Sequence, residues 1–232
     1  PKGRVFKEFR PDVHIREVEH DEELPLYIWE DPGYGHAHAI EVAQIAPGGQ
    51  VRVIEEIYEQ GIITEDLIRA CMMRPWWKNP NKTLVIDPNY ANQHHGTHSI
   101  AEIWLAEAHL TAAGVRVKIS EGTERLKSFL KVNALTGEPG IVFSPRCKGV
   151  LSELGAYPNP FDGLTKVYSW KMDREGNVVG DEPDDKNCDG VKAVCYGLVE
   201  RFGLAQTTGN RFFVMKRHPE DFSSRRIPSG RR

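Results

Sequence analysis

Residues 26–33 read LYIWEDPG, an apolar run that ends in a carboxylate followed by a turn. Pro32 has no N–H to donate to a sheet, and Gly33 tolerates backbone angles that other residues avoid. The pattern therefore predicts a strand that ends at Asp31. Its side chain would lie at the carboxyl edge of a sheet, which is where α/β proteins bind ligands.

A second apolar run, residues 83–86 (TLVI), ends in the same way at Asp87 and Pro88. Each aspartate alone also suits a simple turn, because Asp before Pro is common in turns. Two strands that each deliver a carboxylate to one sheet edge can instead hold a divalent metal ion, which prefers oxygen ligands. We favour the metal-site hypothesis for the pair.

Composition bounds the class of protein. The 232 residues have a mean hydropathy of −0.47 and a formal net charge of −3, which predicts a globular chain and argues against a generic nucleic-acid coat. No apolar run is long enough to cross a membrane. The four cysteines, at 71, 147, 188 and 195, form no CxxC pair, so we expect free thiols.

The order of expected elements predicts an α/β fold with a mixed sheet. Strands at 26–31, 38–45 and 51–58 are separated by short turns and read as an antiparallel meander. Helices and parallel strands then alternate, which places helices on both faces of the sheet. The further elements are expected at 64–77 (helix), 83–86 (strand), 99–113 (helix), 115–119 (strand), 121–134 (helix), 140–143 (strand), 145–156 (helix), 164–179 (hairpin) and 187–202 (helix).

The expected domain organisation has three parts. Residues 1–25 are charged and irregular and are predicted to form a linker or arm outside the core. Residues 26–203 form the domain, and residues 204–232 form a basic tail.

Six strings in this order resemble the nuclease domain of the large terminase subunit of tailed bacteriophages, which has a ribonuclease H-like (RuvC-like) fold. The resemblance covers most of residues 1–200. The strings are 4–9 (RVFKEF) with 13–15 (VHI), 29–33 (WEDPG), 51–58 (VRVIEEIY), 86–88 (IDP), 146–157 (RCKGVLSELGAY) and 192–198 (KAVCYGL).

The resemblance implies a metal-dependent endonuclease that cuts concatemeric viral double-stranded DNA during genome packaging. Its two ions, Mg²⁺ or Mn²⁺, would be held by Asp31, Asp87 and Asp189, with Asp31 bridging both. Asp185 or its neighbour Asp184 is the alternative third ligand. The implied partners are double-stranded DNA, the phage portal, the small terminase subunit and an ATPase domain of the same polypeptide, in the host cytoplasm.

The chain departs from the family pattern in the segment that supplies the third ligand. Cys188 and Asp189 stand at the two ligand positions, where the family commonly has Asp-His, Asn-His or two acids. Lys192 stands where the family has an Asp, and Cys195 stands where it has an Arg. No G-x-x-x-x-G-K-[ST] motif occurs, so we expect the nuclease part alone.

Further polar residues have two interpretations each. Lys127 and Lys131 share a helix face and could track DNA phosphates or simply be solvated. His94 and His95 could lie near phosphates. Together with the histidines at 36, 38 and 98 they also raise a zinc alternative, which lacks a completing ligand set.

Glu55 and Glu56 alternate on a strand, so one of them is expected to face the site edge.

Two other functions remain open. One is a non-catalytic module that docks DNA or the portal through a degenerate site, and the other is a RuvC-like resolvase or transposase core.

Overall fold

The computed structural model describes residues 3–92, 94–95, 98–114 and 116–205. Its centre is a six-stranded mixed sheet with the strand order β7-β4-β1-β2-β3-β8. The strands are β1 (Leu26–Asp31), β2 (Ala37–Ile45), β3 (Val51–Gln60), β4 (Lys82–Ile86), β7 (Ala112–Ala113) and β8 (Ile141–Phe143). β1, β2 and β3 are antiparallel, whereas β4 on β1, β7 on β4 and β8 on β3 are parallel. This arrangement confirms the predicted ribonuclease H-like mixed sheet.

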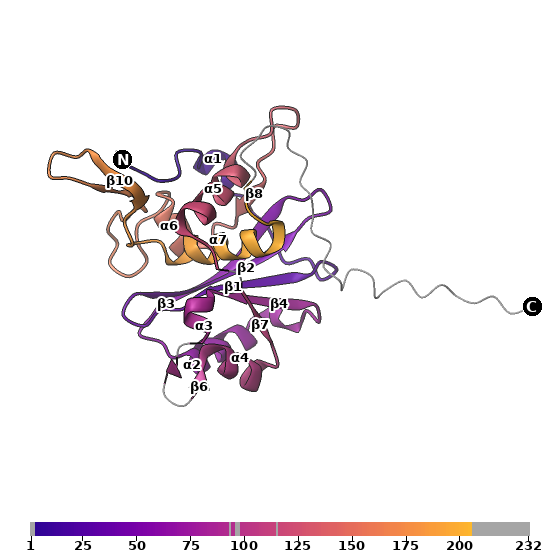
Figure 1. The fold of residues 1–232 in the computed structure, drawn as a ribbon. Helices are drawn as coiled ribbons and strands as arrows, with labels where there is room; N and C mark the ends of the chain where they lie inside the picture. Colours follow the sequence, from indigo (N-terminus) through magenta and orange to yellow (C-terminus); the bar gives the residue numbers. More distant parts are fainter. Residues whose placement is uncertain (1–2, 93, 96–97, 115, 206–232) are drawn as a thin grey trace, which may run out of the picture.

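Helices cover both faces of the sheet (Figure 1). One face carries α5 (Ile119–Leu130), α6 (Lys148–Glu153) and α7 (Asp189–Phe202), and the other carries α2 (Thr64–Met72) and α4 (Ile100–Ala108). Each face buries its own apolar core, as expected when strands are covered on both sides. The short elements are α1 (Pro11–His14), η1 (Pro75–Lys78), α3 (Pro88–Ala91), β5 (His94–His95), β6 (His98–Ser99), β9 (Trp170–Met172) and β10 (Val178–Pro183).

Helix α7 lies directly on the sheet because two of its residues have no side chain. A Cβ at Gly197 would lie 2.0 Å from the Trp29 ring, and one at Gly190 would lie 2.8 Å from Glu41 Oε1. This close approach brings the first turns of α7 to the carboxyl ends of β1 and β4.

The N-terminal segment corrects one prediction. It is not an arm outside the core, because Val5, Phe6 and Phe9 are 0–2% exposed within the same core as α7. The Val5 amide also donates to the Tyr168 carbonyl. The many charged residues of this segment favoured the prediction of an exposed arm. Its three apolar residues are buried only because partners far along the chain cover them.

Several predicted boundaries were wrong around residues 64–119. The helix expected at 64–77 ends at Met72, because Pro75 starts a separate 3₁₀ turn. Ser99 does cap α4 through a capping box with Glu102, but that helix ends at Ala108, where His109 takes the left-handed conformation. The parallel partner of β4 is therefore 112–113, and residue 119 already begins α5.

Later boundaries also moved. The helix expected at 121–134 ends at Leu130, and the one expected at 145–156 is shorter, running from Lys148 to Glu153. The predicted hairpin turn is present, with the Asp173 amide donating to the Asn177 carbonyl. Its second strand extends to Pro183, beyond the end predicted at residue 179.

The basic tail predicted at 204–232 lies almost wholly outside the described residues. Within the described part of the chain, no helix combines the length and apolarity that crossing a bilayer requires.

Candidate functional site

Three aspartates come together at the carboxyl edge of the sheet. Asp31 ends β1, Asp87 follows β4 as the N-cap of α3, and Asp189 is the first residue of α7. Glu30 is paired with Ile86 in the parallel register, so the next residues, Asp31 and Asp87, continue side by side. All three are buried, with exposed fractions of 1%, 5% and 8%.

Asp31 is the aspartate on which the charges of its neighbours act. Burial raises its pKa well above the usual value, and the charges of Asp189 and Asp87 raise it further, while Lys192 acts in the opposite direction. The buried Oδ1 of Asp31 receives no hydrogen bond from any described residue. A buried carboxylate oxygen without a donor is costly, so this atom is free for a ligand.

Asp87, by contrast, is held in place by two donors. Its Oδ1 accepts from the Asn89 amide at 2.9 Å, and its Oδ2 accepts from the Tyr196 hydroxyl at 3.0 Å. Tyr196 lies two turns along α7 from Asp189, so the same helix supplies one aspartate and orients another.

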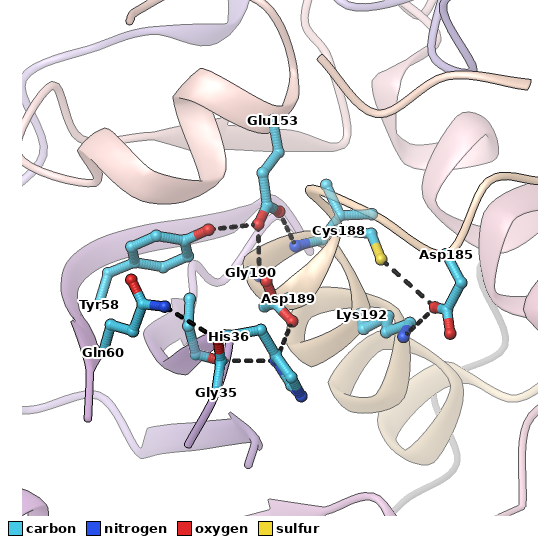
Figure 2. Close-up of polar contacts among 12 residues, drawn as sticks. Gly35, His36, Tyr58, Gln60, Glu153, Asp185, Cys188, Asp189, Gly190 and Lys192 are labelled. Atoms are coloured by element: carbon cyan, nitrogen blue, oxygen red, sulfur yellow. Dashed lines mark hydrogen bonds and ion pairs between the residues drawn. The ribbon is translucent and has the colours of Figure 1, made fainter. Parts of the chain in front are cut away.

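Asp189 makes an ion pair with His36, whose Nδ1 lies 2.7 Å from its Oδ1 (Figure 2). The hydrogen bond from this ring raises the pKa of His36. The His36 side chain is half exposed and comes from the turn between β1 and β2. A cavity of about 120 Å³ lies next to this turn and is lined in part by Pro32, Gly33 and Tyr90, so solvent reaches this edge of the sheet.

Asp185 pairs with Lys192, whose Nζ lies 2.6 Å from its Oδ1 (Figure 2). This hydrogen bond lowers the pKa of Asp185. Burial opposes the charge of Lys192, but Asp31 and Asp185 outweigh that effect and raise its pKa. The alternative ligand Asp184 lies 3.9 Å from Lys186.

Glu153 is a fourth buried acid that the sequence did not single out. Its carboxylate accepts from the Tyr58 hydroxyl at 2.8 Å and from the amides of Gly190 and Val191 at the start of α7 (Figure 2). Burial, followed by the charge of Asp189, raises the pKa of Glu153 to about 8. Its only sequence signal was its place in the string 146–157.

The predicted DNA-contacting residues are not joined to this cluster. Lys127 pairs with Glu124 at 2.8 Å and lies over the Trp170 ring, and Lys131 follows the end of α5. His94 and His95 lie in β5, but their side chains are outside the described part of the structure. Their role in DNA binding stays a prediction.

Three other predicted residues lie away from the site edge. His38 is buried and pairs with Glu30 at 2.6 Å. Glu56 is buried beneath α6, and Glu55 lies 3.9 Å from Arg146, so neither reaches the aspartates.

The donor set fits a hard divalent ion in its chemistry. Among the described residues, no three His, Cys, Asp or Glu side chains stand ready-made around a metal position. The aspartates nevertheless offer carboxylate oxygens, including the donor-free Oδ1 of Asp31, and the electrostatic cost at Asp31 falls when a cation arrives. Asp31, Asp87 and Asp189 are the residues that would hold such an ion.

Solved structures share this fold. The large terminase of a thermophilic bacteriophage matches with a TM-score of 0.63 and 14% identity over 86% of this chain. The P22 large terminase nuclease domain matches with a TM-score of 0.59 and 14% identity, over 87% of this chain and 94% of that domain. The nuclease domain of the bacteriophage SPP1 large terminase with bound Mn matches with a TM-score of 0.52 and 13% identity, over 85% of this chain and 98% of that one.

The chain has the fold of large terminase nuclease domains. It spans 45% of the length of the thermophilic phage's large terminase but nearly all of the P22 nuclease domain. No family model and no curated protein matches the sequence. The terminase-nuclease fold thus persists here with little sequence identity, and the site residues must be argued from the geometry of this chain.

Proposed function

We propose that this chain is the nuclease domain of a phage large terminase and cuts concatemeric viral double-stranded DNA in a divalent-metal-dependent reaction. The observation that carries the proposal is Asp31. It is buried between Asp87 and Asp189 on a terminase-nuclease fold, with one oxygen that lacks a donor among the described residues. We propose Asp31, Asp87 and Asp189 as the ligands and Mg²⁺ or Mn²⁺ as the ion.

A bound divalent ion supplies positive charge that stabilises the attacking and leaving oxygens of phosphodiester hydrolysis. The chain's own residues prepare the place for this chemistry. Tyr196 and the Asn89 amide fix the orientation of Asp87, and Glu153 ties the first turn of α7 to Tyr58. His36 holds Asp189 and, when protonated, competes with a cation for it.

The wider setting is also proposed from the resemblance. An ATPase domain of the same polypeptide would drive packaging, and the portal and the small terminase subunit would be partners, in the host cytoplasm. The additional length of the thermophilic phage's large terminase supports a further domain beside this one.

A plasmid assay tests the proposal. Supercoiled DNA is incubated with the chain in Mn²⁺, in Mg²⁺ or in EDTA. The variant Asp31→Asn is run in parallel, with Asp66→Asn, at an exposed position of α2, as the control. We expect nicking and linearisation in the metal buffers, none in EDTA, loss in Asp31→Asn and no change in Asp66→Asn. Undiminished cutting by Asp31→Asn would overturn the assignment of the site.

Two observations favour a second function, a non-catalytic docking module. The charge of the Lys192 ammonium acts on Asp31, and no ready-made metal group is present among the described residues. This alternative predicts DNA binding without cleavage in every metal buffer.

A further inference from the structure

Lys192 has a place in the site that a merely solvated lysine would not have. On α7, Asp189, Lys192 and Tyr196 follow one another at intervals of three and four residues and so share one helix face. Asp189 marks one end of this face, and Tyr196 marks the other by donating to Asp87. Lys192 therefore leaves the helix between these two positions, and the charge of Asp31 acts on its ammonium.

The ammonium is also held in position. Its Nζ lies 2.6 Å from Asp185 Oδ1, and only 19% of the side chain is exposed. Asp185 Oδ1 also accepts a hydrogen bond, 3.7 Å long, from the thiol of Cys188, the residue just before α7 (Figure 2). A largely buried, paired lysine of this kind is a fixed positive charge rather than a mobile surface group.

The charge balance decides how many ions such a site accommodates. Asp31, Asp87, Asp189 and the ammonium's partner Asp185 carry four negative charges when ionised, which two divalent ions would balance if the ammonium were absent. With the ammonium of Lys192 in place, one divalent ion leaves one negative charge, and a second would leave one positive charge in excess. Because uncompensated charge is expensive in a buried place, the lysine disfavours the second ion.

We propose that Lys192 is a fixed cation of this site and takes the place of one of two divalent ions, so that each chain binds a single ion. The inference rests on the proposed nuclease function and specifies its metal content. The compact ammonium of Lys192, whose charge acts on Asp31, stabilises negative charge that develops on a bound phosphate. A preorganised cation does the same in other phosphoryl-transfer sites.

The test counts bound Mn²⁺ by electron paramagnetic resonance and calorimetry in the absence of DNA. It uses the wild type, Lys192→Met, Lys192→Arg and the exposed control Lys186→Met. We expect one Mn²⁺ per wild-type chain and a Hill coefficient near one for Mn²⁺ in cleavage. Lys192→Met should bind Mn²⁺ about 10-fold more tightly, because a neighbouring positive charge is gone. Its cleavage should fall about 10²-fold, the usual loss when one charge-stabilising group is removed.

The other variants separate charge from structure. Lys192→Arg should keep the single Mn²⁺ and part of the cleavage, and Lys186→Met should match the wild type. Two Mn²⁺ per wild-type chain, or unchanged Mn²⁺ affinity in a folded Lys192→Met, would overturn the inference. If Lys192→Met does not fold by circular dichroism, the wild-type count and Lys192→Arg decide. A wild type that binds Mn²⁺ but cuts no DNA refutes the proposed function instead. The number of Mn²⁺ ions bound per chain can still be measured in that case.

Discussion

Asp31 and Glu41 lie on adjacent strands beneath the same helix, yet their carboxyl groups have opposite surroundings. Glu41 faces Glu56 across the register of β2 and β3, and both are buried. Glu56 accepts from the amides of Gly149 and Val150 at 2.7 Å each. An ionised Glu41 would find no donor among the described residues. Burial, followed by the charge of Glu56, raises the pKa of Glu41 well above its usual value, which favours a protonated, neutral Glu41 beside Glu56.

The interior pair and the edge cluster thus differ in their need for a cation. A neutral Glu41 adds no charge, and two amides hold Glu56, so the interior pair calls for no cation. Asp31 has an oxygen without a donor among the described residues, like-charged neighbours and a nearby lysine. Burial and an oxygen without a partner in the described part of the chain therefore do not mark a functional acid in this fold, because Glu41 has both properties. The mark is a place at the solvent-reached edge beside further carboxylates, which Asp31 alone of the two has.

The largest expected effect separates the two groups by activity. Asp31→Asn should lower DNA cleavage by about 10³-fold, as when a group that stabilises transition-state charge is lost. Glu41→Gln should stay within about threefold of the wild type, because a neutral amide replaces a neutral acid of the same shape away from the site edge. Rates of plasmid nicking in Mn²⁺ measure both. Equal losses in the two variants would break the distinction between an edge site and an interior pair.

The next effect concerns stability. Glu56→Ala should lower the free energy of unfolding by about 3 kcal/mol, because the amides of Gly149 and Val150 lose their acceptor. The neighbouring Glu55→Ala should cost about 1 kcal/mol or less, since its partner Arg146 lies at 3.9 Å near the surface. Urea denaturation followed by circular dichroism gives both values. A cost for Glu55→Ala as large as for Glu56→Ala would contradict this account.

The pH dependence of stability tests Glu153, which borders both groups. Its pKa is about 8 when folded, well above the unfolded value, so the folded state holds the proton more tightly. That contribution is complete below the unfolded pKa and is lost as the pH rises through the folded pKa. In EDTA we expect a loss of about 1–3 kcal/mol between pH 5 and pH 9, by linkage.

Glu153→Gln removes this titration and should make the decline smaller, and the part that stays comes from Asp31 and Glu41, whose pKa values are also raised. The exposed Glu59→Gln should leave the wild-type slope. Urea midpoints measured at each pH supply the comparison. The same decline in Glu153→Gln as in the wild type would show that Glu153 ionises normally.

The smallest effect concerns His36. The pKa of His36 is raised by its hydrogen bond to Asp189, so protonated His36 occupies that aspartate at low pH. Mn²⁺ affinity should therefore rise by about three- to tenfold from pH 6 to pH 8, with a smaller rise in His36→Gln. Calorimetric titrations of the two proteins measure this, with the exposed His98→Gln as control. An identical rise in His36→Gln would assign the effect to another group.

Much of the fold followed from local pattern. The apolar runs before Asp31 and Asp87 have the composition of buried strands, and Pro32 and Pro88 stop them for reasons contained within a few residues. The antiparallel meander, the parallel β4 and the closing helix α7 were all predicted in order. The boundaries around Ala108 and Ala113 failed because His109 leaves the helical conformation, which helix propensity does not foresee.

Local sequence pattern was enough for the ends of β1 and β4 and for the mixed sheet, and the resemblance added Asp189 to the proposed ligands. Only the tertiary structure decided which groups surround them, and it buried Phe6 and Phe9 in the core. Lys192 beside Asp31, Tyr196 on Asp87 and His36 on Asp189 join residues that lie far apart in the chain. The two groups of features differ in the separation along the chain of the residues that interact. Hydrophobic period and turn chemistry act between near neighbours, whereas burial, charge and hydrogen-bond satisfaction depend on distances that exist only after α7 has packed on the sheet.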